Sequence, residues 1–499
     1  MHQLICDARE GVIPVPIQPV TTGVPDLDAL LGGGLTQNAL VLFVGRPGAG
    51  KTILASQILF HAVQHGTPTL LLTTHAEGQT KILEHLRPFR FFDEQVIGSS
   101  LTLLSLPSLV GSNIDTAAGA LSKAIRESGA QMVLLDGIQG LNDQFQDSTA
   151  TRRLLATLAT MLSYLNVTLL VTLTGLVRDV LTTQELITAD VVLGLEFGVD
   201  NWRHTRRIEV LKQRGRAHLA GFHSYTITGD GVRIVPRLEA RPISESRPRP
   251  HGRVPFALSE LDQLLGGGVT AGTTTLLIGA PGVGKTTLAL YWSLAADKVA
   301  GASIFLSFDE RLTDLDAKAT IFGMPLQSAL ESNAFTFLFL SPVELDPDAV
   351  AARLLAAITP QTTRIVIDNF LVLVRSLGSR AYDYVTALRS HLYAAGVTTM
   401  ILVEITPFAG LQVDVEQQPW GLLADNIVIV QQVVALGAIR RMLAVLKMRL
   451  SAYDATLREL TLDEQGIHVL TPPESAQGVL AATAGITGLT APPASSDPA

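Results

Sequence analysis

The chain has 499 residues, of which 47% are hydrophobic and 16% are charged, and its formal net charge is −8. A length of this size suggests about two to four domains, each able to bury a core. The acidic balance argues against binding of nucleic acid through bulk charge. A single cysteine, Cys6, excludes internal disulfides and a cysteine-based zinc site. No apolar run reaches the roughly 20 residues needed to cross a bilayer, and Met1–Glu10 lacks the features of a signal peptide. We therefore expect a cytoplasmic protein without a membrane partner.

The N-terminal part of the chain leads into a phosphate-binding motif. Residues 1–20 are rich in proline and are expected to be extended, and a short helical pattern then ends in a glycine triplet at 32–34. The apolar run Ala39–Val44 precedes residues 45–52, GRPGAGKT, and the helical pattern Ile53–Val63 follows them. Residues 45–52 fit G-x-x-x-x-G-K-[ST], the P-loop, in the strand–loop–helix context that this motif requires.

The rest of the first half alternates between apolar runs and helical patterns. Near-continuous apolar strands that alternate with helices are typical of a parallel sheet covered on both faces. The half closes with two alternating patterns that are suited to antiparallel edge strands, Thr205–Gln213 and Tyr225–Val235. The expected strands before them are Thr69–Thr74, Gln131–Leu135, Val167–Thr174 and Ala189–Leu195, and the expected helices are Gln79–Leu86 and Ser148–Leu165.

The second half repeats this order, with a second P-loop at residues 279–286, GAPGVGKT. Corresponding landmarks lie about 232–235 positions apart along the whole chain, so a tandem duplication is the simplest explanation. A stretch rich in proline and arginine separates the two halves and is expected to be an extended linker. The predicted organisation is an extended segment at 1–20, a domain at 21–236, a linker at 237–255, a second domain at 256–471 and a disordered tail at 472–499.

Each P-loop predicts a site for ATP and Mg²⁺. Glycines let backbone N–H groups turn around a phosphate, and the helix N-terminus adds its positive end. The lysine reaches the β- and γ-phosphates, while the threonine and an aspartate at the end of a neighbouring strand hold Mg²⁺. The predicted nucleotide-binding residues are Gly45, Gly48, Ala49, Gly50, Lys51, Thr52, Ile53, Gly279, Gly282, Val283, Gly284, Lys285, Thr286 and Thr287. The predicted metal ligands are Thr52, Asp136, Thr286 and Asp368.

Acidic residues follow a further strand that the chain forms between the P-loop and the metal-binding aspartate. They are Asp309 and Glu310 in the second half and Glu77 in the first, where Ala76 takes the place of Asp309. A carboxylate at this position could orient or deprotonate the water that attacks the γ-phosphate. A solvated acid at the start of a helix is the alternative interpretation.

A Lys-x-Arg pair recurs near the end of each half, as Lys212 and Arg214 and as Lys447 and Arg449. Residues two apart on a strand point to the same side. In ring-forming P-loop ATPases such a pair can reach the γ-phosphate of a neighbouring subunit as an arginine finger. A solvated basic edge or a nucleic-acid contact would produce the same pattern.

From about residue 20 to 470 the chain resembles the family of KaiC, the circadian-clock ATPase. The resemblance rests on residues 27–34, LDALLGGG, on both P-loops, on Phe308-Asp309-Glu310 and on the stretches Arg206–Gly215 and Val445–Arg449. It implies an α/β fold of two tandem RecA-like P-loop NTPase domains, each with a mostly parallel central sheet flanked by helices. It also implies ATP bound between the subunits of a homo-hexameric double ring, with Asp309 as the base.

Two departures from that family shape the functional prediction. Ala76 makes hydrolysis by the N-terminal domain depend on Glu77, so one ring could be purely structural. The stretch Asp414–Asp425, where KaiC phosphorylates itself, contains no Ser, Thr or Tyr. We therefore expect a signalling or regulatory ATPase with unidentified regulatory partners. The alternatives are a serine/threonine autokinase that uses Ser451 or Thr406 as acceptor, and a DNA-binding ATPase of the RecA, RadA or DnaB type, which the acidic balance disfavours.

Overall fold

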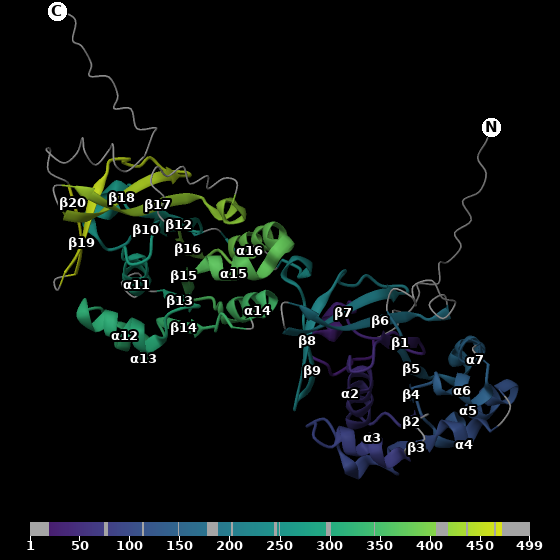
Figure 1. The fold of residues 1–499 in the computed structure, drawn as a ribbon. Coiled ribbons are helices and arrows are strands. Elements are labelled where there is room, and N and C mark those ends of the chain that lie inside the picture. Colours follow the sequence, from purple (N-terminus) through teal and green to yellow (C-terminus); the bar gives the residue numbers. More distant parts are fainter. Residues whose placement is uncertain are drawn as a thin grey trace, which may run out of the picture. The chain divides into compact units, whose positions relative to one another are not determined.

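The computed structural model describes residues 19–73, 78–111, 114–147, 149–176, 188–200, 203–243, 247–248, 250–295, 301–343, 345–405, 418–435, 438–463 and 466–471. The chain divides into two compact units, Met1–Ala240 and Arg241–Ala499 (Figure 1). Among the described helices, none is both long and apolar enough to span a membrane.

The first unit is built on a nine-stranded sheet in the order β3-β2-β4-β5-β1-β6-β7-β8-β9. The six strands from β3 to β6 are parallel, and β7, β8 and β9 extend the sheet as antiparallel neighbours. The strands are β1 (Leu40–Gly45), β2 (Thr69–Thr73), β3 (Leu101–Ser105), β4 (Met132–Asp136), β5 (Thr168–Thr174), β6 (Val191–Asp200), β7 (Arg203–Gln213), β8 (His223–Thr228) and β9 (Gly231–Val235).

Helices cover both faces of this sheet, as Figure 1 shows. Alternate residues of β1 enter two separate cores: Val41 and Phe43 pack with residues of α2, whereas Leu40, Leu42 and Val44 pack with α5 and α7. This alternation follows from the two-residue period of a strand that is buried on both faces. The helices are α1 (Leu27–Leu30), α2 (Lys51–Gln64), α3 (Gly78–Leu86), α4 (Leu106–Val110), α5 (Ile114–Ser128), α6 (Gly140–Phe145) and α7 (Ala150–Leu165), with 3-10 turns at Glu94–Val96 and Leu238–Ala240.

The second unit repeats the same sheet in the order β14-β13-β15-β16-β12-β17-β18-β19-β20. Its strands are β12 (Thr274–Gly279), β13 (Ala302–Ser307), β14 (Phe335–Phe339), β15 (Thr362–Asp368), β16 (Thr398–Glu404), β17 (Asn426–Ala435), β18 (Ala438–Met448), β19 (Arg458–Asp463) and β20 (Gly466–Leu470). Its helices are α10 (Ser259–Leu264), α11 (Lys285–Leu294), α12 (Leu312–Ile321), α13 (Leu326–Glu331), α14 (Pro347–Ala357), α15 (Phe370–Leu377) and α16 (Ala381–Ala394), with 3-10 turns at Gly378–Arg380 and Pro419–Leu423.

The α/β architecture predicted from the alternating pattern is confirmed: each unit has a mostly parallel sheet flanked by helices. The pattern Tyr225–Val235 forms two strands rather than one, because the chain turns between Thr228 and Gly231, which pair with each other. Within the predicted linker, β10 (Arg253–Val254) pairs with β11 (Val269–Thr270), and the N–H of Arg247 donates to the carbonyl of Ala394 at 2.9 Å.

Candidate nucleotide-binding and catalytic sites

In each P-loop, the glycine directly before the lysine cannot be replaced by another residue without strain. Gly50 and Gly284, directly before α2 and α11, have φ of 87° and 98°. A Cβ added to Gly50 would lie 2.5 Å from Cδ1 of Ile227, and one added to Gly284 would lie 2.7 Å from Cδ1 of Leu462. Glycine at these positions lets the backbone of each loop curve directly before a helix N-terminus. This arrangement of N–H groups is the one that binds phosphate.

The two P-loop lysines are held by their own loops in the same way. Each ammonium donates to two backbone carbonyls, at 2.8–3.0 Å, on the strand end and the residue after it. The acceptors are Gly45 and Arg46 for Lys51, and Gly279 and Ala280 for Lys285. Burial lowers the pKa of both lysines, and Asp136 opposes this for Lys51 while Glu404 and Asp368 oppose it for Lys285. The side chains are thus preoriented over the loop that would hold the phosphates.

Threonine and aspartate meet beside each loop as the sequence predicted. The Thr52 hydroxyl donates to Oδ1 of Asp136 at 2.8 Å, and the Thr286 hydroxyl donates to Oδ2 of Asp368 at 2.9 Å. Hydroxyl and carboxylate oxygens are the ligands that Mg²⁺ prefers, and Mg²⁺ at such sites completes its shell with phosphates and water. The donor set and the glycine cradle therefore both fit Mg-ATP.

Asp368 lies in an environment that disfavours its negative charge. Burial raises the pKa of Asp368 to about 7, the charges of Glu310 and Asp309 add to this, and the Thr286 hydrogen bond and Lys285 oppose it. A divalent cation beside the carboxylate would offset the cost of burying its charge. In the first unit Asp136 accepts a second hydroxyl, from Thr172 at 2.7 Å.

Asp309 and Glu310 follow β13 and have different surroundings. Asp309 is exposed and accepts a hydrogen bond from the Asn369 side chain at 3.0 Å. Glu310 is half-buried, and one carboxylate oxygen forms an ion pair with Lys318. Of the two acids, Asp309 is thus the more accessible to a water molecule. Glu77 and Ala76, the corresponding positions of the first half, lie outside the described residues.

The strand order brings another carboxylate to the second loop. In sequence β13 lies between β12 and β15, but in space β16 lies between them and β13 lies beyond β15. Glu404, at the end of β16, is paired in register with Gly279, whose carbonyl accepts from Lys285. In the first unit Thr174 pairs in the same way with Gly45. No sequence pattern marks Glu404, because only the spatial order of the strands places it at the loop.

The first Lys-x-Arg pair lies at one end of the central strands, and the P-loop of the same unit lies at the other end. Arg214, one residue past β7, donates to Asp190 at 3.3 Å, and Asp190 also accepts the N–H of Leu40, at the start of β1. Lys212 pairs in register with Val192 near the start of β6. The P-loop begins at the other end of β1, roughly 17 Å away at 3.3 Å per residue.

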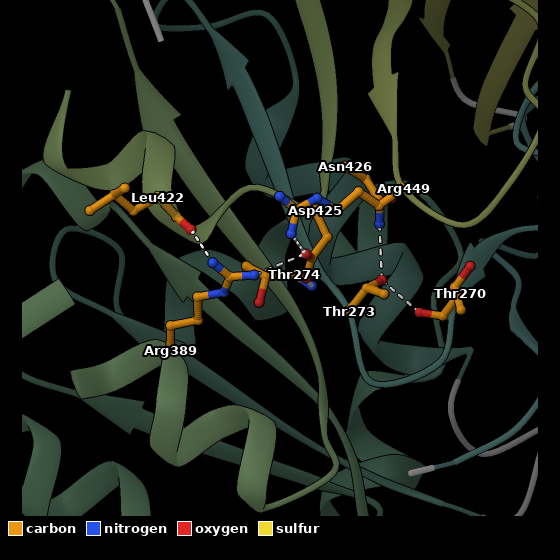
Figure 2. A network of polar contacts seen from close by, with 8 residues as sticks. All are labelled: Thr270, Thr273, Thr274, Arg389, Leu422, Asp425, Asn426 and Arg449. Carbon is orange, nitrogen blue, oxygen red and sulfur yellow. Dashed lines mark hydrogen bonds and ion pairs between the residues drawn. The ribbon is translucent and has the colours of Figure 1, made fainter. Parts of the chain in front are cut away.

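The second pair repeats this geometry. Arg449 donates to Asp425 at 3.5 Å, and Asp425 accepts the N–H of Thr274, the first residue of β12, at 3.1 Å (Figure 2). Lys447 pairs in register with Ile427 at the start of β17. The structure therefore brings lysine and arginine together in each unit and keeps both away from the P-loop of the same unit.

The remaining predicted residues form the walls of the loops. Ala49 and Val283 are buried, and the Ala49 carbonyl accepts a hydrogen bond from the Tyr225 hydroxyl. Gly48 and Gly282 have positive φ, while Ile53 and Thr287 lie in the first turn of α2 and α11. Among the suggested phosphate acceptors, the Ser451 hydroxyl donates to the Ala452 carbonyl at 2.7 Å. Thr406 and residues 414–417 lie outside the described part of the chain.

Comparison with known proteins agrees with this geometry. The family model "ATPase: KaiC" matches residues 20–239 and 254–474. "Circadian clock oscillator protein KaiC" of Picosynechococcus sp. is 26% identical over 464 residues, which cover 90% of this chain and 89% of the relative. The protein of the same name from Acaryochloris marina is 25% identical over 484 residues (94% and 92%), and "Circadian clock protein KaiC3" of Synechocystis sp. is 25% identical over 485 residues (94% of each). With two matched domains that together span most of its length, the chain belongs to the KaiC family of ATPases.

Proposed function

We propose that this protein hydrolyses Mg-ATP at sites that two neighbouring copies share within a ring of six, and that turnover changes the ring for a signalling or regulatory purpose. One observation carries the proposal. In each unit the Lys-x-Arg pair lies at one end of the P-loop strand and the loop lies at the other. A head-to-tail arrangement of copies would set the pair of one copy against the loop of the next.

In the second domain, the residues around the P-loop would have separate roles in binding and catalysis. Lys285 and the backbone of the second P-loop would bind and orient the phosphates, and Thr286 and Asp368 would hold Mg²⁺, which would supply positive charge against the phosphates. Asp309 accepts a proton from the attacking water, and Asn369 orients Asp309 through its hydrogen bond. Lys51, Thr52 and Asp136 have the corresponding roles in the first domain, with Glu77 as the candidate acid.

The neighbouring copy supplies the remaining positive charge. Lys447 and Arg449 would act on the nucleotide of the second domain, and Lys212 and Arg214 on that of the first, by stabilising charge on the transferring phosphoryl group. Because of Ala76, we propose that the second domain performs most of the turnover. We place this activity in the cytosol, in keeping with the single cysteine of the chain, and leave regulatory proteins as partners of unknown identity.

Sizing by light scattering with and without ATP, on the full-length protein, tests the shared site. We expect a shift to hexamers when Mg-ATP is added, and we expect Arg449→Ala to lose turnover while still binding ATP. Arg353→Ala, at an exposed position of α14, is the matched control and should behave like the parent protein. A protein that hydrolyses ATP at full rate as a monomer would contradict the proposal.

A further inference from the structure

Asp425 is shared by two arginines. Its Oδ1 accepts from Nη2 of Arg389 at 3.3 Å and from Nη1 of Arg449 at 3.5 Å, and its Oδ2 accepts the N–H of Thr274. Figure 2 shows the two guanidinium groups directed at the same carboxylate, one from α16 and the other from the end of β18. Two like charges on one carboxylate oxygen repel each other, so each weakens the hold of Asp425 on the other.

The two arginines are not held equally. Arg389 is anchored a second time, because its Nη1 donates to the carbonyl of Leu422 at 3.0 Å, and its side chain is 37% exposed. Arg449 is 57% exposed, and its bond to Asp425 is at the limit of hydrogen-bond length. Of the pair, Arg449 is therefore the one that can leave Asp425 at low cost.

In the first unit, Asp190 and Arg214 correspond to Asp425 and Arg449. The position that corresponds to Arg389 has a different residue. Counted back from the starts of β5 and β16, the position of Arg389 on α16 corresponds to Ala159 on α7. The same count places Asn166 opposite Gly396, and both have positive φ. Ala159 carries no charge. A cavity of about 460 Å³ is lined there by Ala159, Asp190 and Arg214, among others.

We propose that Arg389 is a positioning residue for Arg449. By taking part of the Asp425 charge, it keeps Arg449 only loosely attached and ready to swing towards the nucleotide of the neighbouring copy. In the first unit Ala159 stands in this place and supplies no such charge to Asp190. This inference rests on the proposed function, since it assigns a control to the shared site.

The test measures ATP turnover of full-length protein that carries Lys51→Ala. This substitution removes turnover by the first domain, so the measured rate is that of the second domain. Arg389→Gln keeps a donor for the Leu422 carbonyl but removes the charge. We expect its kcat to fall about two- to fivefold, the range of an exposed ion pair, with KM unchanged. Arg389→Lys, which keeps the charge, should retain most of the rate. High salt should diminish the loss, because it screens the pair of Arg449 with Asp425.

Asp425→Asn separates positioning from a general structural role. Asparagine can still accept the N–H of Thr274 but no longer holds Arg449 by charge, so adding Arg389→Gln to Asp425→Asn should have no further effect. An equal loss from Arg389→Gln with and without Asp425→Asn, or an unchanged kcat in Arg389→Gln alone, would overturn the inference. Arg449→Ala is the reference: if it leaves kcat unchanged, the shared site itself is wrong and the inference falls with it.

Discussion

Asp368 links the stability of the second domain to pH in a way that one substitution can isolate. Burial raises the pKa of Asp368 from 3.8 to about 7 in the folded protein. In the unfolded chain the carboxyl is hydrated again and its pKa returns to about 3.9. A pKa that is higher in the folded state contributes stability at low pH, and this stability is lost as pH rises towards the folded value.

The size of the effect follows from the shift. Between about pH 5 and pH 7 the unfolded chain has lost this proton and the folded domain still holds it, so the free energy of unfolding falls by roughly 2 kcal/mol over this range. Little further change from this group is expected above about pH 8, where both states are ionised. Asp368→Asn removes the titration while keeping the shape, so this part of the pH dependence should disappear.

The assay is urea unfolding of the metal- and nucleotide-free protein, followed by tryptophan fluorescence. Trp292 and Trp420 are buried in the second unit, and Trp202→Phe removes the third tryptophan of the chain, so the signal reports the second domain. Asp383→Asn, at an exposed position of α16, is the control and should keep the parent's pH dependence. Identical pH dependence in the parent and in Asp368→Asn would show that burial of the Asp368 carboxyl does not couple stability to pH.

Four further substitutions test the loops. Gly284→Ala places a Cβ 2.7 Å from Leu462 at a positive φ, so the second domain should lose about 1–2 kcal/mol of stability and bind ATP more weakly, as measured by urea unfolding and nucleotide titration; an unchanged midpoint would contradict the fit argument. Glu404→Thr removes a negative charge beside Lys285, so Mg-ATP should bind several-fold more tightly in calorimetry, and weaker binding would show that Glu404 instead supports the site. Lys285→Ala should abolish most steady-state turnover and Lys51→Ala only a small part, whereas the reverse ranking would assign catalysis to the first domain.

Much of the fold could be predicted because its signals are local. Apolar runs such as Met132–Asp136 and the doubled P-loop identify buried parallel strands and their order along the chain. The spatial order could not be read in this way, since crossover connections place β16 rather than β13 beside β12. The tight turn that splits Tyr225–Val235 was missed, although Gly229-Asp230-Gly231 is typical of a turn and the apolar residues change phase across it.

In the candidate sites, too, residues marked by a local motif could be predicted, and residues placed by distant contacts could not. The pairing of Thr286 with Asp368 was predicted, because the motif fixes the threonine and a strand end fixes the aspartate. The sequence did not mark Asn369, Glu404 or Arg389. Each is brought to its site by a contact with a residue far away in the sequence. Such contacts are set by strand register and helix packing, which a single sequence does not reveal.

A subunit-mixing experiment decides whether the P-loop of one copy works with the arginine of the next. Lys285→Ala lacks the loop lysine and Arg449→Ala lacks the finger, so each protein alone should be nearly inactive. In rings co-assembled from equal amounts, about a quarter of the interfaces pair an intact loop with an intact finger, so about a quarter of the parent's second-domain turnover should return. Mixed rings that remain as inactive as the two separate variants would contradict a site shared between copies.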